Sequence, residues 1–123
     1  MHIAIQGQAG SFHDQAAQQW YGPDAEIIPC TTFSEVFAAY DDGSADAIIT
    51  AVENTLFGSI NEVYRYIEEC DAPIVGEIKL PVEQMLIGLP DAKISDITEV
   101  YSHPVALSQC RYFLQEHLPQ ATP

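Results

Sequence analysis

Positive charge is scarce in this sequence. Lys and Arg number four against eighteen Asp and Glu, and the formal net charge is −14. Proteins that bind nucleic acids regardless of sequence use a basic patch to displace counterions, and this chain has too few basic residues to form one. The same shortage disfavours an anionic membrane surface. We therefore expect no nucleic acid and no membrane as partners, and we expect backbone N–H groups to hold most of any anionic ligand.

Cysteine is also scarce, and long apolar runs are missing. The 3 cysteines include no C-x-x-C pair, which argues against a disulfide framework or a zinc ribbon, and the 4 histidines show no metal-ligand spacing. No run of about 18 apolar residues is present, so no transmembrane helix is predicted. The first residues lack the basic and apolar regions of a signal peptide. We expect a cytoplasmic protein with reduced, mostly buried thiols and no bound metal.

Apolar residues, in contrast, are plentiful. The 123 residues are 47% hydrophobic and 10% aromatic, which excludes a disordered or fibrous chain. A chain of this length corresponds to one domain or to two small lobes.

Strand and helix patterns alternate through the first part of the chain. Strands are predicted at residues 3–5, 26–30 and 46–52, and helices at residues 13–21, between Thr32 and Gly43, and at residues 60–70. Thr32 with Glu35 three positions later fits a capping box. The nearly continuous apolar run at 46–52 is typical of a parallel strand covered on both faces. This order predicts a right-handed α/β unit.

The pattern changes after residues 71–73. Residues 74–80 and 84–89 indicate two successive strands, and residues 105–118 indicate a helix that Pro104 begins. We therefore expect a first lobe over residues 1–72 and a second over residues 73–123. A lobe this thin would expose sheet edges and an apolar helix face. Either a partner chain completes it or the chain is a fragment of a longer protein.

Two polar turns, at residues 7–12 and 53–59, each connect a buried strand to a helix. In an open parallel sheet such turns gather at the carboxyl ends of the strands, where ligands bind. A helix N-terminus there can hold a carboxylate without Lys or Arg. The alternative is that these residues are ordinary N-caps and turn formers. Neither turn has the spacing of a dinucleotide fingerprint or a P-loop.

A third cluster consists of Ser102, His103 and Pro104, followed by Cys110. His103 can act as an acid or base, or Ser102 or His103 can simply cap the helix that Pro104 begins. A Cys–His nucleophile is disfavoured, because Cys110 would lie on the apolar face of the helix about two turns from His103.

These clusters together resemble the prephenate dehydratase family. The matching stretches are G-x-x-G-S-F-H-x-Q-A-A (residues 7–17), A-V-E-N-T-x-x-G-S-I (51–60), G-E-I-x-L-P-V (76–82) and V-Y-S-H-P-x-A-L-x-Q-C (100–110). Each stretch alone is weak, but four in register across nearly the whole chain are specific. His13 stands where the family has Ser, so a hydroxyl role does not carry over there. Thr55 replaces the Ser of the family's E-N-S and keeps a hydroxyl.

The resemblance implies a fold and a site. The fold is α/β and two-lobed, like a type II periplasmic binding protein, here with the second lobe incomplete. The active cleft lies between the lobes. The substrate-binding residues implied are Ser11, Phe12, Asn54, Thr55, Gly58, Ser59, Ser102 and His103. Asn54 and Thr55 would also support catalysis.

The family reaction converts prephenate to phenylpyruvate, carbon dioxide and water in phenylalanine biosynthesis, without a metal or organic cofactor. Family members are typically homodimers. The family's catalytic Thr-Arg-Phe motif, and the regulatory domain that binds phenylalanine in many members, do not occur in these 123 residues.

Three hypotheses follow. The chain is an N-terminal portion of a prephenate dehydratase with little activity alone. Alternatively, it is a non-catalytic module that binds a small aromatic carboxylate in the cleft. In the third, it is a short active enzyme completed by a partner chain in a homodimer.

Overall fold

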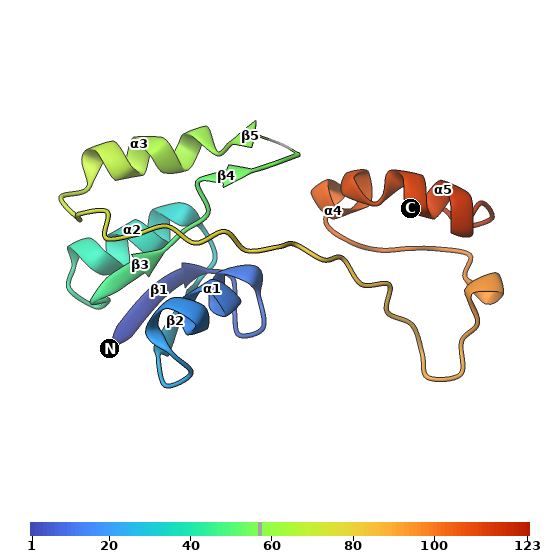
Figure 1. The fold of residues 1–123 in the computed structure, drawn as a ribbon, viewed down its shortest axis with the longest axis horizontal. Coiled ribbons are helices and arrows are strands. Elements are labelled where there is room, and N and C mark those ends of the chain that lie inside the picture. The colour runs from blue at the N-terminus through green and yellow to red at the C-terminus, as the bar shows by residue number, and fades with distance from the viewer. Residues whose placement is uncertain (57) are drawn as a thin grey trace. The chain divides into compact units, whose positions relative to one another are not determined.

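The computed structural model describes every residue except Phe57, and it divides into two compact units, Met1–Pro81 and Val82–Pro123 (Figure 1). The first unit is built on a parallel sheet of three strands in the order β2-β1-β3, with β1 at His2–Gln6, β2 at Glu26–Cys30 and β3 at Ala47–Ile49. Its central register pairs Ala4 with Ile28 and with Ile48. The predicted parallel α/β unit is therefore confirmed.

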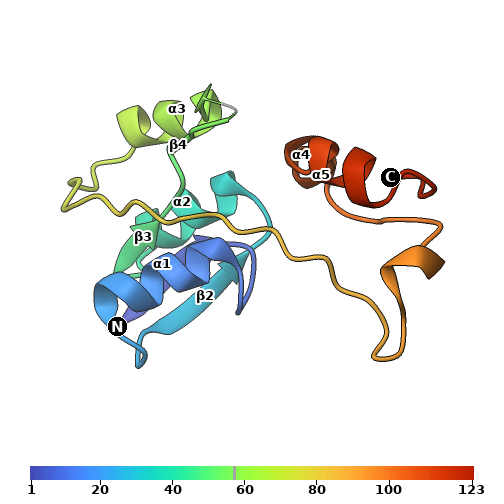
Figure 2. The same cartoon turned by 45° about the vertical axis from the view of Figure 1, so that its right-hand side comes forward.

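Helices cover both faces of this sheet (Figures 1 and 2). Helix α1 spans Phe12–Tyr21, α2 spans Phe33–Asp41 and α3 spans Asn61–Glu69. Side chains alternate along a strand, so β1 contributes to two cores. Ile3 and Ile5 pack with Ala17 of α1, and Ala4 packs on the other face with residues of α2 and α3, among them Val36 and Val63. This arrangement explains the nearly continuous apolar pattern of the third strand.

Local signals set the helix ends as predicted. The Thr32 hydroxyl accepts a hydrogen bond from the Glu35 N–H (3.2 Å), and the Glu35 carboxylate accepts one from the Thr32 N–H (3.4 Å), which completes the capping box. Gly22 ends α1 with a φ of 92°, a backbone conformation that residues with a Cβ rarely adopt.

The chain leaves the sheet earlier than expected after β3. The third strand ends at Ile49 rather than Val52, because its ladder with β1 stops at the pair Ile5–Ile49. The following turn forms a small antiparallel hairpin of β4 (Glu53–Asn54) and β5 (Gly58–Ser59).

The two strands predicted at residues 74–80 and 84–89 are wrong. The structure contains no helix or strand there, and Ile74 and Ile87 expose 77% and 87% of their surface. A strand requires a neighbouring backbone as well as an alternating pattern, and no neighbour pairs with these residues in the described part of the chain. The segment passes close to α1 at Gly76, where an added Cβ would overlap the indole of Trp20. The lobe boundary at residues 72 and 73 stays a prediction.

The second unit is mainly helical. It contains the 3₁₀ turn η1 (Ile94–Asp96), α4 (Pro104–Gln109) and α5 (Arg111–His117), and it buries Leu118. The single helix predicted at residues 105–118 is divided at Cys110, whose ψ of 3° interrupts the helical backbone. Across the residues that the structure describes, no helix has the length and apolar character needed to span a membrane.

Candidate functional site

The carboxyl edge of the parallel sheet is the place where the first two sequence clusters meet. The connection from β1 through α1 to β2 runs on one face of the sheet, and the connection from β2 through α2 to β3 runs on the other. The chain order therefore changes direction at the point between β1 and β3. Crevices at such switch points bind ligands in open α/β sheets. The turn after β1 and the segment after β3 begin on either side of this point.

The first turn is stabilised by a buried carboxylate. Asp14 is 4% exposed and accepts hydrogen bonds from the Gly10 N–H (2.7 Å) and from the Gln18 side chain (3.0 Å). The Ser11 hydroxyl caps α1 by accepting from the Asp14 N–H at 3.2 Å. Ser11 therefore acts as the N-cap that the alternative interpretation named. The Asp14 carboxylate thus stabilises the glycine turn that precedes α1.

The second turn is more open. The Asn54 side-chain oxygen accepts from the Leu56 N–H at 2.9 Å, while Thr55 and Ser59 are exposed. Gly58 has a φ of 76°, which suits glycine. Among the residues that the structure describes, no side chain caps the N-terminus of α3 at Ile60. The Val63 N–H donates to the Ile60 carbonyl at 2.9 Å, so the N–H groups of Asn61 and Glu62 are those that α3 can offer to an anion.

His13 connects the two turns. Its Nε2 accepts a hydrogen bond from the Ala51 N–H at 3.1 Å, and its ring lies edge-on to Phe33 with centroids 6.1 Å apart. Burial lowers the pKa of His13, and a hydrogen bond to the backbone of Gln6 opposes this shift only in part. The ring is therefore neutral at pH 7. The hydrogen bond between Ala51 and His13 was not predicted from the sequence. The signal that could have indicated it is a polar ring in the first turn of a helix that follows a glycine-containing turn.

A hollow of about 470 Å³ opens at the same edge, beside the ends of β1 and β2. It is lined by Gln6, Gly7, Gln8, Pro29, Cys30 and Thr31. Of these, Gly7 and Gln8 belong to a predicted turn. The remaining residues were not predicted because neither strand β2 nor the turn that follows it carries a motif.

The third cluster lies in the second unit. His103 is the N-cap of α4, and its Nδ1 accepts from the Val105 N–H at 3.2 Å. Pro104 occupies the first turn of that helix, so the capping interpretation is confirmed. Ser102 and His103 are both exposed.

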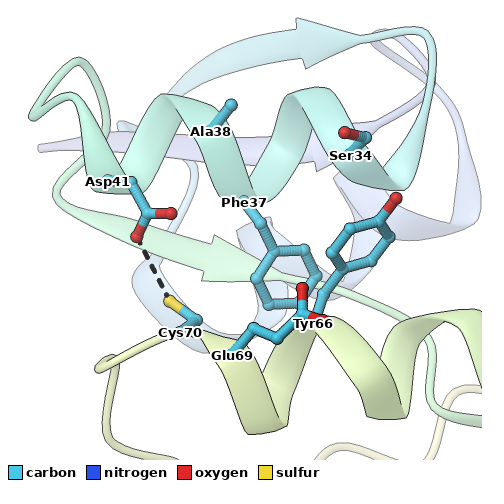
Figure 3. Close-up of a pocket in the computed structure, with 7 residues that line it drawn as sticks. All are labelled: Ser34, Phe37, Ala38, Asp41, Tyr66, Glu69 and Cys70. Atoms are coloured by element: carbon cyan, nitrogen blue, oxygen red, sulfur yellow. Dashed lines mark hydrogen bonds between the residues drawn. The ribbon is translucent and has the colours of Figure 1, made fainter.

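A second hollow lies between α2 and α3 (Figure 3). Phe37 and Tyr66 stack at its base with ring centroids 5.3 Å apart, and the Cys70 thiol donates to the Asp41 carboxylate at 3.5 Å. Burial and the nearby carboxylates raise the pKa of Cys70, so its nucleophilic thiolate is disfavoured. Among the described residues, no three His, Cys, Asp or Glu side chains lie close enough together to hold a metal ion.

Comparisons with known proteins identify relatives over nearly the whole chain. The sequence model of a family described as prephenate dehydratase matches residues 3–123. The bifunctional chorismate mutase/prephenate dehydratase of Aquifex aeolicus is 37% identical over 95% of this chain, and arogenate dehydratase 5 of Arabidopsis thaliana is 38% identical over 98%. The crystal structure of prephenate dehydratase from Arthrobacter aurescens, in complex with L-Phe, superposes with a TM-score of 0.88 at 30% identity over 99% of this chain.

The chain spans 32% and 28% of the length of these two curated relatives, and 41% of the crystallised one. The match of the family model to residues 3–123 is nevertheless continuous and includes all four sequence motifs. The chain belongs to the prephenate dehydratase family.

Proposed function

We propose that this chain forms the substrate-binding first part of a prephenate dehydratase site, which converts prephenate to phenylpyruvate, carbon dioxide and water. The observation that carries the proposal is the bond from the Ala51 N–H to His13, which brings two family motifs together at the carboxyl edge of the sheet. The proposed binding residues are Ser11, Phe12, Asn54, Thr55, Gly58, Ser59, Ser102 and His103.

The reaction sets requirements that these residues meet in part. The bond from the ring to its carboxylate breaks, the electron pair makes the ring aromatic, and the hydroxyl leaves as water after gaining a proton. A site must therefore hold two carboxylates and donate a hydrogen bond to the leaving hydroxyl. The uncapped N-terminus of α3 supports carboxylate binding, and the exposed Thr55 and half-buried Asn54 supply hydrogen-bonding groups.

Part of the machinery must come from outside these residues. The sequence contains no Thr-Arg-Phe motif, and its two arginines, Arg65 and Arg111, each lie over the ring of the adjacent tyrosine. We propose that a longer chain or a partner subunit supplies the motif. A type II periplasmic-binding-protein-like cleft, a homodimer and a cytoplasmic location belong to the same proposal.

Two assays test the function. The chain is incubated with prephenate, and separately with arogenate because a relative is named for it, while product formation is followed by absorbance. Turnover identifies an enzyme that is active alone. If there is no turnover, the chain is titrated with phenylpyruvate in a calorimeter. Heat of binding identifies a binding lobe or binding module. Absence of heat shows that the chain lacks this site and contradicts the proposal.

Thr55→Val tests the second turn. The change removes the exposed hydroxyl, so phenylpyruvate affinity should fall by about fivefold or more, equivalent to about 1 kcal/mol. Thr55→Ser keeps the hydroxyl and serves as the matched control, with affinity close to that of the unmodified chain. Equal affinity of the Val and Ser variants would remove Thr55 from the site.

A further inference from the structure

We propose that His13 is a positioning residue whose neutral imidazole holds the segment after β3 against the first turn of α1 and so sets the shape of the candidate site. The family motif does not provide this residue, since the family has Ser at this position. For its effect on ligand binding the inference rests on the proposed function, but the bridge itself does not.

The geometry decides the protonation of the ring. A backbone amide only donates, so the bond from the Ala51 N–H requires a free lone pair on Nε2. The proton of the neutral ring must then lie on Nδ1. The imidazole thus joins the first turn of α1 to a residue two positions beyond β3.

The hydrogen bond to His13 lies close in sequence to the second turn, so it can affect the position of that turn. The hydrogen-bonded ladder between β1 and β3 ends at the pair Ile5–Ile49, so strand pairing does not hold the two backbone segments together beyond it. Ala51 lies two residues before β4, the strand that contains Asn54. Movement of Ala51 is therefore transmitted to the second turn over a short stretch of backbone.

Protonation would break the bridge, because Nε2–H and the Ala51 N–H would then face each other as two donors. The charged groups on the surrounding elements are Asp14 on α1, Glu35 on α2 and Glu53 after β3. Asp14 and Glu35 accept hydrogen bonds from backbone N–H groups of their own turns, and Glu53 is exposed. Of the described residues, none makes an ion pair with His13 that would retain the proton, and burial keeps its pKa below the usual value near 6.5.

Two variants separate a neutral bridge from other roles. His13→Phe keeps a ring beside Phe33 but cannot accept from Ala51. His13→Gln offers a side-chain oxygen for the same bond and does not titrate. His117→Gln, at an exposed histidine of α5, is the matched control for loss of one imidazole.

The first experiment needs no ligand. Nitrogen NMR shifts of the imidazole report its tautomer, and hydrogen exchange of the Ala51 amide is followed between about pH 8 and about pH 5, the range that contains the usual histidine pKa. We expect an Nδ1–H tautomer, and an Ala51 amide whose protection, corrected for intrinsic exchange, falls as the pH drops. In His13→Phe, protection should be about tenfold lower than in the unmodified chain at about pH 8 and should not change with pH, and in His13→Gln it should also be independent of pH. An Nε2–H tautomer, or equal protection in the Phe variant, would overturn the bridge.

The second experiment measures phenylpyruvate affinity over the same pH range. A neutral bridge predicts that binding weakens about fivefold on acidification, whereas a cationic histidine that binds the carboxylate predicts stronger binding. His13→Gln should bind equally at both pH values, and His117→Gln should behave like the unmodified chain. If the unmodified chain does not bind at any pH, the proposed function fails, while the Ala51 exchange still decides the bridge.

Discussion

Asp14 shows how much a single buried residue contributes to the candidate site. It is the buried charged side chain of the described structure, and it satisfies Gly10, a residue of the first turn, from inside α1. A carboxylate in the first turn of a helix is also favoured by the helix dipole. The first turn is therefore shaped by a group that the chain supplies to itself, and the pattern of glycines alone did not indicate this.

Asp14→Ala should lower the free energy of unfolding by about 2 kcal/mol, because the Gly10 N–H loses its acceptor in a partly buried place. Asp14→Asn keeps an acceptor and should lose less. Asp24→Ala, at an exposed turn residue, is the control and should change little. Urea unfolding measures all three. An Ala variant as stable as the control would show that the Gly10 bond adds nothing to stability.

Thr50 presents the opposite case at the same edge of the sheet. Its hydroxyl oxygen is buried without a hydrogen-bond partner among the described residues. Replacing an unpaired buried hydroxyl by a methyl group of the same shape removes a desolvation cost. Thr50→Val should therefore leave stability unchanged or raise it by up to about 1 kcal/mol in thermal unfolding.

Thr32→Val provides the contrast, because its hydroxyl caps α2 and its loss should cost about 1 kcal/mol. If Thr50→Val is destabilised as much as Thr32→Val, the Thr50 hydroxyl has a partner in solution, such as an ordered water.

At the scale of elements, local signals predicted the helices better than the later strands. The Thr32 capping box and Gly22 act through neighbours in the sequence, so their effect is visible without the fold. The strands predicted at residues 74–80 and 84–89 depended on an alternating pattern, which specifies a face but no pairing partner. The division of the last helix at Cys110 has no signal in the sequence that we can identify.

Hydrogen exchange tests this difference directly. Amides of β1 pair with β2 and β3 and should be strongly protected, whereas amides of residues 74–88 have no such ladder and should exchange within minutes. Mass spectrometry of peptic peptides resolves the two regions. Strong protection of residues 74–88 would mean that they pair as strands in solution, as their sequence pattern indicates.

At the scale of the whole molecule, charge is the dominant property. A net charge of −14 on 123 residues places carboxylates near one another over much of the surface. Their mutual repulsion destabilises the compact state, and the few cations offset it little. Lys79, for example, approaches Glu77 at 3.9 Å while both side chains are largely exposed, which contributes little.

Salt should therefore stabilise this chain. Raising NaCl from about 0.01 M to about 0.2 M shortens the screening length and weakens the repulsion, so the Tm should rise. Scanning calorimetry in a buffer that is itself dilute measures the change, and the same series in choline chloride controls for a specific effect of sodium. A Tm that falls with salt would show that attractive pairs outweigh repulsion.

Residue identity and neighbours within a few positions were enough to predict the family, the parallel α/β start, the helix caps and the sign of the charge. The fold was needed to show that Asp14 accepts a hydrogen bond from Gly10, that His13 accepts one from Ala51, and that residues 74–89 form no strand. Each of these depends on groups far apart in the sequence or on the presence of a partner backbone. No local pattern records whether a distant donor, acceptor or strand lies within reach.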